Sequence, residues 1–316
     1  MSDTLTHSVD LIIPLFNEAA VIGQLHARIR AVVDGLPYEF RFLYVDDGST
    51  DGTTDSLSAL AQADPRVTPL LLSRNFGHQA ALSAGMQASR ADIAITMDGD
   101  GQHPPELIPQ MLELIRQGYD VVQTQRVEPA GAASFKKWSS DLFYLFINLV
   151  SGTQILPGAA DFRALSAQAM AALRSMPEFH RFLRGMVAWI GYPSVILPYQ
   201  PGSRIGGHSK YSLGKMFRLA MDALFSFSLV PLYIGLSAGG LLLCLALAEI
   251  AYVLSVWIGG RTSELAPGWS SLMFVILIVG GVLMVLLGFI GVYIGYIFQE
   301  VKRRPLYLIK QERHPE

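Results

Sequence analysis

Two short acidic motifs in this 316-residue chain could do chemistry. Residues 98–103 read D-G-D-G-Q-H, and residues 46–49 read D-D-G-S. Two carboxylates two residues apart offer hard oxygen ligands for Mg²⁺ or Mn²⁺, with Gln102 as a neutral oxygen ligand and His103 as a weaker addition. Aspartate and glycine also favour turns, so the first motif alone is equally consistent with a simple turn. In the second motif, a turn and a carboxylate that accepts hydrogen bonds from a nucleotide are compatible readings.

The segments around these motifs predict a sheet that would position them. Compact apolar runs alternate with helical periodicity, which predicts a doubly wound α/β domain with its ligands at the carboxyl ends of the strands. Strands are expected at 9–15, 40–45, 67–72 and 93–97, and helices at 19–33 and 78–88. Because the acidic motifs directly follow two of these strands, they are expected near one another, which favours the site over the simple turn.

Several function classes are disfavoured by what the sequence lacks. No G-x-G-x-x-G motif follows the first strand and no G-x-x-x-x-G-K-[ST] motif occurs, which argues against a dinucleotide oxidoreductase and a P-loop NTPase. The formal net charge of −2 provides no basic field for nucleic acid. The single cysteine, Cys244, excludes an intrachain disulfide and a cysteine-cluster metal site.

The C-terminal third has the composition of a membrane segment. Apolar stretches run over about 229–258 and 271–298, with Glu249 as the only charged residue inside them. Each exceeds the roughly 20 residues that cross a bilayer, and the short, turn-rich connection predicts a transmembrane hairpin over 229–298. The alternative, a buried helix pair in a soluble core, is disfavoured because the chain has too little other material to wrap it. Residues 211–228 predict an amphipathic helix at the membrane interface.

Charge asymmetry predicts the orientation of the chain. The tail, 299–316, contains Lys302, Arg303, Arg304 and Lys310, whereas the connection between the apolar stretches has one arginine. By the positive-inside rule, the tail and the N-terminal domain, 1–210, are expected on the cytoplasmic side of the membrane.

An ordered set of motifs resembles glycosyltransferase family 2 with the GT-A (Rossmann-like) fold. Within that family the chain is similar to polyprenyl-phosphate glycosyltransferases, such as dolichol-phosphate mannose synthases and bactoprenol-phosphate glucosyltransferases. The resemblance covers nearly the whole chain, including the hairpin. It is carried by Pro14 with Asn17 and Glu18, and by the segments 46–51, 73–77, 98–106, 161–163, 181–185 and 207–211.

The resemblance implies a role for each matched residue. The residues matched to the nucleotide-sugar pocket are Pro14, Glu18, Asp46, Asp47 and Asp98. Those matched to a Mg²⁺ or Mn²⁺ site are Asp98, Asp100 and Gln102. Because two anionic groups must approach each other, cations and a hydrogen-bond donor are also expected at the acceptor phosphate, and the candidates are Arg126, Lys136, Lys137, Arg204, Ser209 and Lys210, of which the family match favours Arg204 and Lys210. Those expected in catalysis are Asp161, Asp100 and Arg126.

Some of these roles have structural alternatives. Asp161 is either a base or acceptor-side carboxylate, or the structural partner of Arg163 or another arginine. The segment 204–211 is either part of the acceptor site or a basic loop at an anionic membrane surface, and for Lys136 and Lys137 the two readings are evenly balanced. The family's commoner motif is D-A-D-L-Q, so the glycines at 99 and 101 predict a more flexible loop.

The activity implied by the resemblance is an inverting sugar transfer from a nucleotide sugar to undecaprenyl or another polyprenyl phosphate. UDP-glucose is the preferred donor, with UDP-linked amino sugars and GDP-mannose left open. The implied protein is a multi-pass component of the bacterial inner (plasma) membrane and a homo-oligomer, with a tetramer as one candidate. The competing readings are a processive polysaccharide synthase, whose Q-x-x-R-W element is not evident, and a non-enzymatic membrane scaffold.

Overall fold

The computed structural model describes residues 7–127, 158–179, 181–200, 230–260 and 268–310. The chain divides into two compact units. The first, here called the sheet unit, comprises Met1–Met216 and Pro305–Glu316, and the second, the helix unit, is Phe217–Arg304. The predicted interfacial helix, 211–228, lies outside the described residues.

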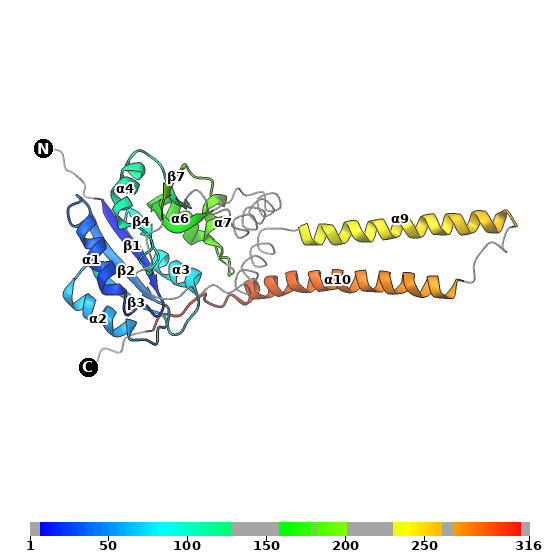
Figure 1. The fold of residues 1–316 in the computed structure, drawn as a ribbon, viewed down its shortest axis with the longest axis horizontal. Helices are drawn as coiled ribbons and strands as arrows, with labels where there is room; N and C mark the ends of the chain where they lie inside the picture. The colour runs from blue at the N-terminus through cyan, green and yellow to red at the C-terminus, as the bar shows by residue number, and fades with distance from the viewer. Residues whose placement is uncertain (1–6, 128–157, 180, 201–229, 261–267, 311–316) are drawn as a thin grey trace. The chain divides into compact units, whose positions relative to one another are not determined.

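The sheet unit is built on one seven-stranded sheet with the order β3-β2-β1-β4-β6-β5-β7 (Figure 1). Strands β1 to β4 are parallel, as predicted for the doubly wound half, whereas β6 runs antiparallel to both of its neighbours. Strand β7 is parallel to β5, so the sheet is mixed. The strands are β1 (Ser8–Leu15), β2 (Glu39–Asp46), β3 (Val67–Leu71), β4 (Ile93–Thr96), β5 (Val121–Arg126), β6 (Ala159–Ser166) and β7 (Ser194–Tyr199).

Helices cover both faces of this sheet. Side chains alternate along each strand, so Leu11 and Ile13 of β1 face one helical layer while Ile12 faces the other. The first layer contains α1 (Ile22–Val33), α2 (Thr53–Ala63), the 3₁₀ turn η1 (Pro105–Leu107) and α4 (Ile108–Arg116). The second contains α3 (His78–Ala88) and α6 (Ala167–Ser175), and a short helix, α7 (Leu183–Trp189), precedes β7.

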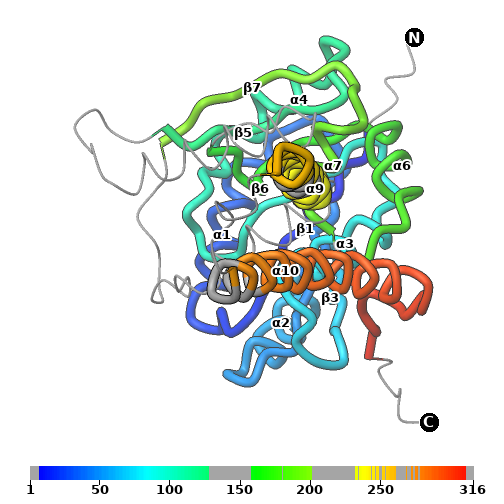
Figure 2. The backbone as a smooth tube through the Cα atoms, turned by 90° about the vertical axis from the view of Figure 1, so that its right-hand side faces the viewer, coloured from blue at the N-terminus to red at the C-terminus, as the bar shows by residue number. Residues whose placement is uncertain are grey.

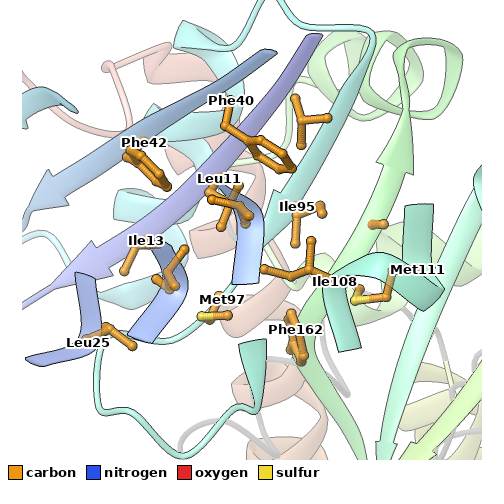
Figure 3. Packing of buried hydrophobic residues seen from close by; sticks show 14 of the residues in the cluster. Leu11, Ile13, Leu25, Phe40, Phe42, Ile95, Met97, Ile108, Met111 and Phe162 are labelled. Carbon is orange, nitrogen blue, oxygen red and sulfur yellow. The ribbon is translucent and has the colours of Figure 1, made fainter. Parts of the chain in front are cut away.

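The larger core lies between the sheet and the first layer (Figure 3). Phe42, Ile95 and Phe162 come from three different strands, and Leu25 and Met111 reach them from α1 and α4. On the opposite face α3 approaches so closely that a side chain at Gly85 would collide with Ile12. Packing on both faces fixes the strand ends from which the polar loops emerge.

The helix unit contains two long helices, α9 (Val230–Ile258) and α10 (Trp269–Lys302). They contact each other, and Gly235 of α9 lies directly against Leu286 of α10. Figure 2 shows α9 nearly end-on, with α10 inclined to it. Within the part of the chain that the structure describes, one segment, Ile278–Lys302, is long and apolar enough to span a membrane, with a mean hydropathy of 2.4 and none of it buried.

Candidate active site

The two carboxylates that follow β2 organise the loops around them. Asp46 accepts hydrogen bonds from the Ser49 amide at 2.9 Å and from the Thr54 hydroxyl. Asp47 accepts from the amides of Phe76 at 2.7 Å and Gly77 at 2.9 Å. Burial raises the pKa of Asp47, and these two amides act in the opposite direction. Both carboxylates are therefore structural parts of a turn and also stand at a strand end where a ligand is expected.

Hydrogen bonds join the loop after β1 to the loop after β2. Asn17, in the left-handed region at φ 55°, donates its amide to the Ser49 hydroxyl and accepts from the Thr50 amide, both at 2.9 Å. The Glu18 amide donates to the Thr53 hydroxyl at 2.9 Å. Because Leu15 pairs with Asp46 across the sheet, the predicted pocket residues Pro14, Glu18, Asp46 and Asp47 occupy adjoining strand ends.

The acidic motif after β4 forms a tight turn that depends on both of its glycines. Asp100 Oδ1 accepts a hydrogen bond from the Gln102 amide at 3.0 Å, and Gly101 adopts φ 74°. At Gly99 an added Cβ would lie 2.8 Å from the Pro14 carbonyl oxygen. The departure from the commoner motif thus has a packing reason at Gly99 and a conformational reason at Gly101. The looser loop expected from the sequence stays a prediction.

His103 contacts Asp98 through both of its ring nitrogens. The Asp98 amide donates to His103 Nδ1 at 3.1 Å, and His103 Nε2 lies 3.5 Å from Asp98 Oδ2. The imidazole is 2% exposed and stacks on Phe162, and its burial lowers the pKa of His103. Since Nδ1 accepts a hydrogen bond, the neutral ring carries its proton on Nε2, facing the carboxylate. Both nitrogens are engaged, so His103 is better placed to orient Asp98 than to bind a metal.

The residues proposed for a divalent metal fit such a site. Asp98 Oδ1 is buried and accepts no hydrogen bond within the described residues, although His78 Nε2 lies 3.4 Å away. Gln102 Oε1 already accepts a hydrogen bond from Arg126 Nη2 at 3.0 Å. The described ranges contain no ready-made group of three or more histidine, cysteine, aspartate or glutamate side chains for a metal. Mg²⁺ typically takes one or two carboxylates and completes its shell with water and phosphate oxygens, which matches this donor set.

Asp161, on β6, lies in a buried cluster of cations. It accepts from Arg163 Nη2 at 2.6 Å and from Arg184 Nη2 at 3.1 Å, and His78 Nε2 lies 3.6 Å from it. Burial by itself would raise the pKa of Asp161, but Arg184, His78 and Arg163 hold it well below its usual range. The pairing with Arg163 is therefore present, and the carboxylate is held ionised, which makes it a weak proton acceptor. Its role as a base stays a prediction.

His78 is the site residue that the sequence did not single out. It is the first residue of α3 and directly follows the matched segment 73–77, and its imidazole lies between Asp98 and Asp161. Burial lowers its pKa, but the nearby carboxylates of Asp161 and Asp98 outweigh this and raise the pKa of His78 to about 8. The side chain keeps 40% exposure, so water screens part of the attraction. The sequence feature that could have pointed to His78 is its position directly after the matched segment 73–77.

The predicted acceptor residues are described only in part. Arg126 ends β5, and its guanidinium contacts Gln102 of the acidic motif. Its expected roles in catalysis and at the acceptor phosphate stay predictions. Lys136, Lys137, Arg204, Ser209 and Lys210 lie outside the described residues, so their roles stay predictions.

The family model and the similar sequences agree on one family. The model of glycosyl transferase family 2 matches residues 10–173. A bactoprenol glucosyl transferase of Shigella phage SfV is 33% identical over 96% of this chain and 99% of its own length. A prophage bactoprenol glucosyl transferase homolog of Escherichia coli K12 is 33% identical over 96% and 98%. Mannosyl-3-phosphoglycerate synthase from Rubrobacter xylanophilus is a solved structure with a TM-score of 0.49 and 18% identity, over 68% of this chain and 71% of that one.

Proposed function

Because this chain belongs to glycosyltransferase family 2, we propose that it transfers glucose from UDP-glucose to the phosphate of undecaprenyl or a related polyprenyl phosphate. The product is a polyprenyl-monophosphate sugar with an inverted anomeric configuration. The observation that carries the proposal is the convergence of Asp98, Asp100 and Asp161 with His78 and Arg126 at the sheet edge where β4 and β5 end and the antiparallel β6 begins. The near full-length match to relatives named for bactoprenol supports the lipid acceptor.

The donor half of the reaction needs charge neutralisation at the leaving diphosphate. A Mg²⁺ or Mn²⁺ ion held by Asp98, Asp100 and Gln102 would supply that Lewis acidity when bound. Pro14, Glu18, Asp46 and Asp47 form the edge assigned to the nucleotide, at the ends of β1 and β2. His103 holds Asp98 in place, because its Nδ1 accepts the Asp98 backbone amide hydrogen and its Nε2 faces the Asp98 carboxylate.

The acceptor half needs positive charge more than it needs a base. A phosphomonoester has its second pKa near ~6, so the lipid phosphate is mostly a dianion at neutral pH and is already nucleophilic. Arg126 stands beside the acidic motif and is assigned to this phosphate together with the predicted Lys136, Lys137, Arg204, Ser209 and Lys210. Asp161 is assigned to orienting Arg163 and Arg184 rather than to accepting a proton.

The setting proposed for this reaction is the cytoplasmic face of a bacterial inner membrane. Ile278–Lys302 is one candidate span, and we assign α9 as the second, which makes the chain multi-pass. A homo-oligomer, with a tetramer as one form, is part of the same proposal. The close contact of Gly235 with Leu286 accounts for pairing of the two helices within one chain.

The proposal is tested by sugar transfer to undecaprenyl phosphate in detergent. The full chain is incubated with labelled UDP-glucose, UDP-linked amino sugars or GDP-mannose, with Mg²⁺, Mn²⁺ or EDTA. We expect labelled glycolipid from UDP-glucose, lost with EDTA and reduced about 100-fold in Asp100→Asn, which keeps the turn's hydrogen bond but removes the charge. Asp92→Asn, at the opposite end of β4 and 58% exposed, is the matched control. Product from another donor corrects the sugar, and no product from any donor overturns the function.

A further inference from the structure

The C-terminal segment after α10 is paired with the edge of the sheet. β3 is the outermost strand on its side, and residues 305–310 lie antiparallel to the chain just beyond its carboxyl end. The Ser73 amide donates to the Leu308 carbonyl at 2.8 Å, and the Lys310 amide donates to the Leu71 carbonyl at 2.7 Å. Between them, the Leu72 amide donates to the backbone carbonyl of Asp46 in β2 at 2.9 Å. The segment thus pairs with backbone groups of Leu71 and Ser73, at the carboxyl end of this edge strand and just beyond it.

One side chain anchors this segment. Tyr307 packs against the buried cluster of Val45, Leu72, Ala81 and Ala84, together with Phe76. Leu308 and Ile309 stay 53% and 49% exposed. The attachment therefore depends on the backbone hydrogen bonds and on Tyr307 rather than on a broad apolar interface.

The segment 73–77, which begins at this pairing, supports the nucleotide edge of the site. Its last two amides, those of Phe76 and Gly77, hold both oxygens of Asp47. Its backbone at Arg74 lies so close to Gly48 that a side chain at position 48 would collide with the Arg74 backbone. His78, between Asp98 and Asp161, follows immediately. A shift of 73–77 would therefore move Asp47 and Gly48 at the nucleotide edge, whereas His78 is also held by its contacts with Asp98 and Asp161.

We propose that Pro305–Lys310 is a positioning element of the donor site, which holds segment 73–77 and, through it, Asp47 in the geometry that binds the nucleotide. The inference rests on the proposed function for its ligand, UDP-glucose. It assigns the residues after the apolar helix a part in donor affinity and none in the chemical step. Loss of the pairing should therefore raise the KM for donor and leave kcat and the acceptor KM unchanged.

Lys310→Pro tests the backbone pairing because proline lacks the amide hydrogen that Leu71 accepts. Lys310→Ala keeps that hydrogen and is the matched control. We expect Lys310→Pro to raise the donor KM and the dissociation constant of UDP about fivefold, the effect of roughly one lost hydrogen bond, with kcat and the acceptor KM within about twofold. Lys310→Ala should match the wild type. An unchanged donor KM, or a fall in kcat alone, overturns the proposal.

Two further measurements keep the proposal testable if the proline variant unfolds or the wild type transfers no glucose. Tyr307→Ala should raise the UDP dissociation constant in the same direction, and Tyr307→Phe, which keeps the ring, should restore it. Amide hydrogen exchange measures the effect of Pro305–Lys310 on segment 73–77 without any turnover. The Phe76 and Gly77 amides should exchange faster in Tyr307→Ala than in Tyr307→Phe. Equal exchange in the two variants overturns the inference. If the wild type transfers no sugar but these amides exchange faster in Tyr307→Ala than in Tyr307→Phe, the positioning role is supported and only the proposed function is overturned.

Discussion

At the residue scale, the central feature is a set of three carboxylates and their cationic neighbours. Asp98 and Asp161 come from different strands, and the His78 imidazole stands between them at 3.4 and 3.6 Å. Two carboxylates close to one imidazole repel each other unless that ring donates or carries charge. His78 is thus a positioning residue that holds the metal-side carboxylate and the β6 carboxylate in one arrangement.

Replacing His78 should disturb both carboxylates. We expect His78→Ala to lower kcat/KM about tenfold, equivalent to about 1.4 kcal/mol of transition-state stabilisation. His78→Gln, which retains an N–H donor near the Nε2 position, should recover part of the loss. Kinetics at several metal concentrations check this, because a displaced Asp98 would also raise the metal concentration needed for half-maximal rate. Equal rates for the alanine variant and the wild type would contradict this role.

The environment of Asp161 makes a prediction about pH. An aspartate whose folded pKa is depressed contributes stability that is present above its unfolded pKa of 3.8 and is lost only as pH falls through the folded value. Between pH 6 and 9 its charge is therefore constant, and neither stability nor rate should titrate with it. Any acidic limb of the acceptor kcat/KM should lie near pH ~6, where the lipid phosphate gains a proton.

The Asp161→Asn variant distinguishes two roles of Asp161, the orientation of Arg163 and Arg184 and the acceptance of a proton as a base. It leaves the buried Arg163 without its anionic partner, so we expect a loss of about 3 kcal/mol in the free energy of unfolding, measured by denaturation of the full chain in detergent. The remaining activity should keep the acidic limb of the wild type. Disappearance of that limb in the variant would instead identify Asp161 as the titrating base.

At the element scale, the turn after β4 depends on its contact with β1. The Gly99 backbone lies against the Pro14 carbonyl, so the D-A-D form of the motif does not fit this arrangement without movement. We expect Gly99→Ala to cost about 1–3 kcal/mol of stability by overpacking and to lower the rate, because Pro14 and Asp98 would both shift.

A glycine in open space provides the matched control for this substitution. Gly23 in α1 has no heavy atom within 4 Å of an added Cβ, so Gly23→Ala should stabilise the protein by up to about 1 kcal/mol. Thermal unfolding of the two variants measures both effects with the same chemical change. A Gly99→Ala variant as stable and active as the wild type would show that the turn adapts readily.

At the scale of the whole molecule, the sequence predicted the strands and helices of the doubly wound half because their periodicity is local. It also placed Asp46, Asp47, Asp98 and Asp100 at strand ends, since each follows an apolar run directly. It did not predict that His78 meets Asp98 and Asp161, because that contact joins three elements far apart in the chain. The pairing of Leu308 with Ser73 was missed for the same reason, since the tail was read by its charge alone.

That pairing also constrains the membrane topology. Residues before 217 and after 304 belong to the same sheet unit, so if the chain between them crosses a bilayer as proposed, it crosses an even number of times. Ile278–Lys302 alone would make one crossing and put Ser73 and Leu308 on opposite sides. Two crossings satisfy both observations if α9, 29 residues long, is the second, because about 20 residues suffice to span the hydrocarbon core.

Single-cysteine labelling tests the two crossings. In a Cys244→Ala background, Ser263→Cys lies in the connection between α9 and α10, and Gln311→Cys lies just after the paired tail. With a membrane-impermeant maleimide, we expect Ser263→Cys to be labelled in intact spheroplasts and Gln311→Cys only after lysis. The positive-inside rule gives this orientation, and the pairing of the tail requires that Gln311 share the side of the sheet unit. Labelling of Gln311→Cys in intact spheroplasts would contradict this topology. If a cysteine at an exposed position of the sheet unit stayed protected in the same cells, the tail could not pair with β3 of its own chain.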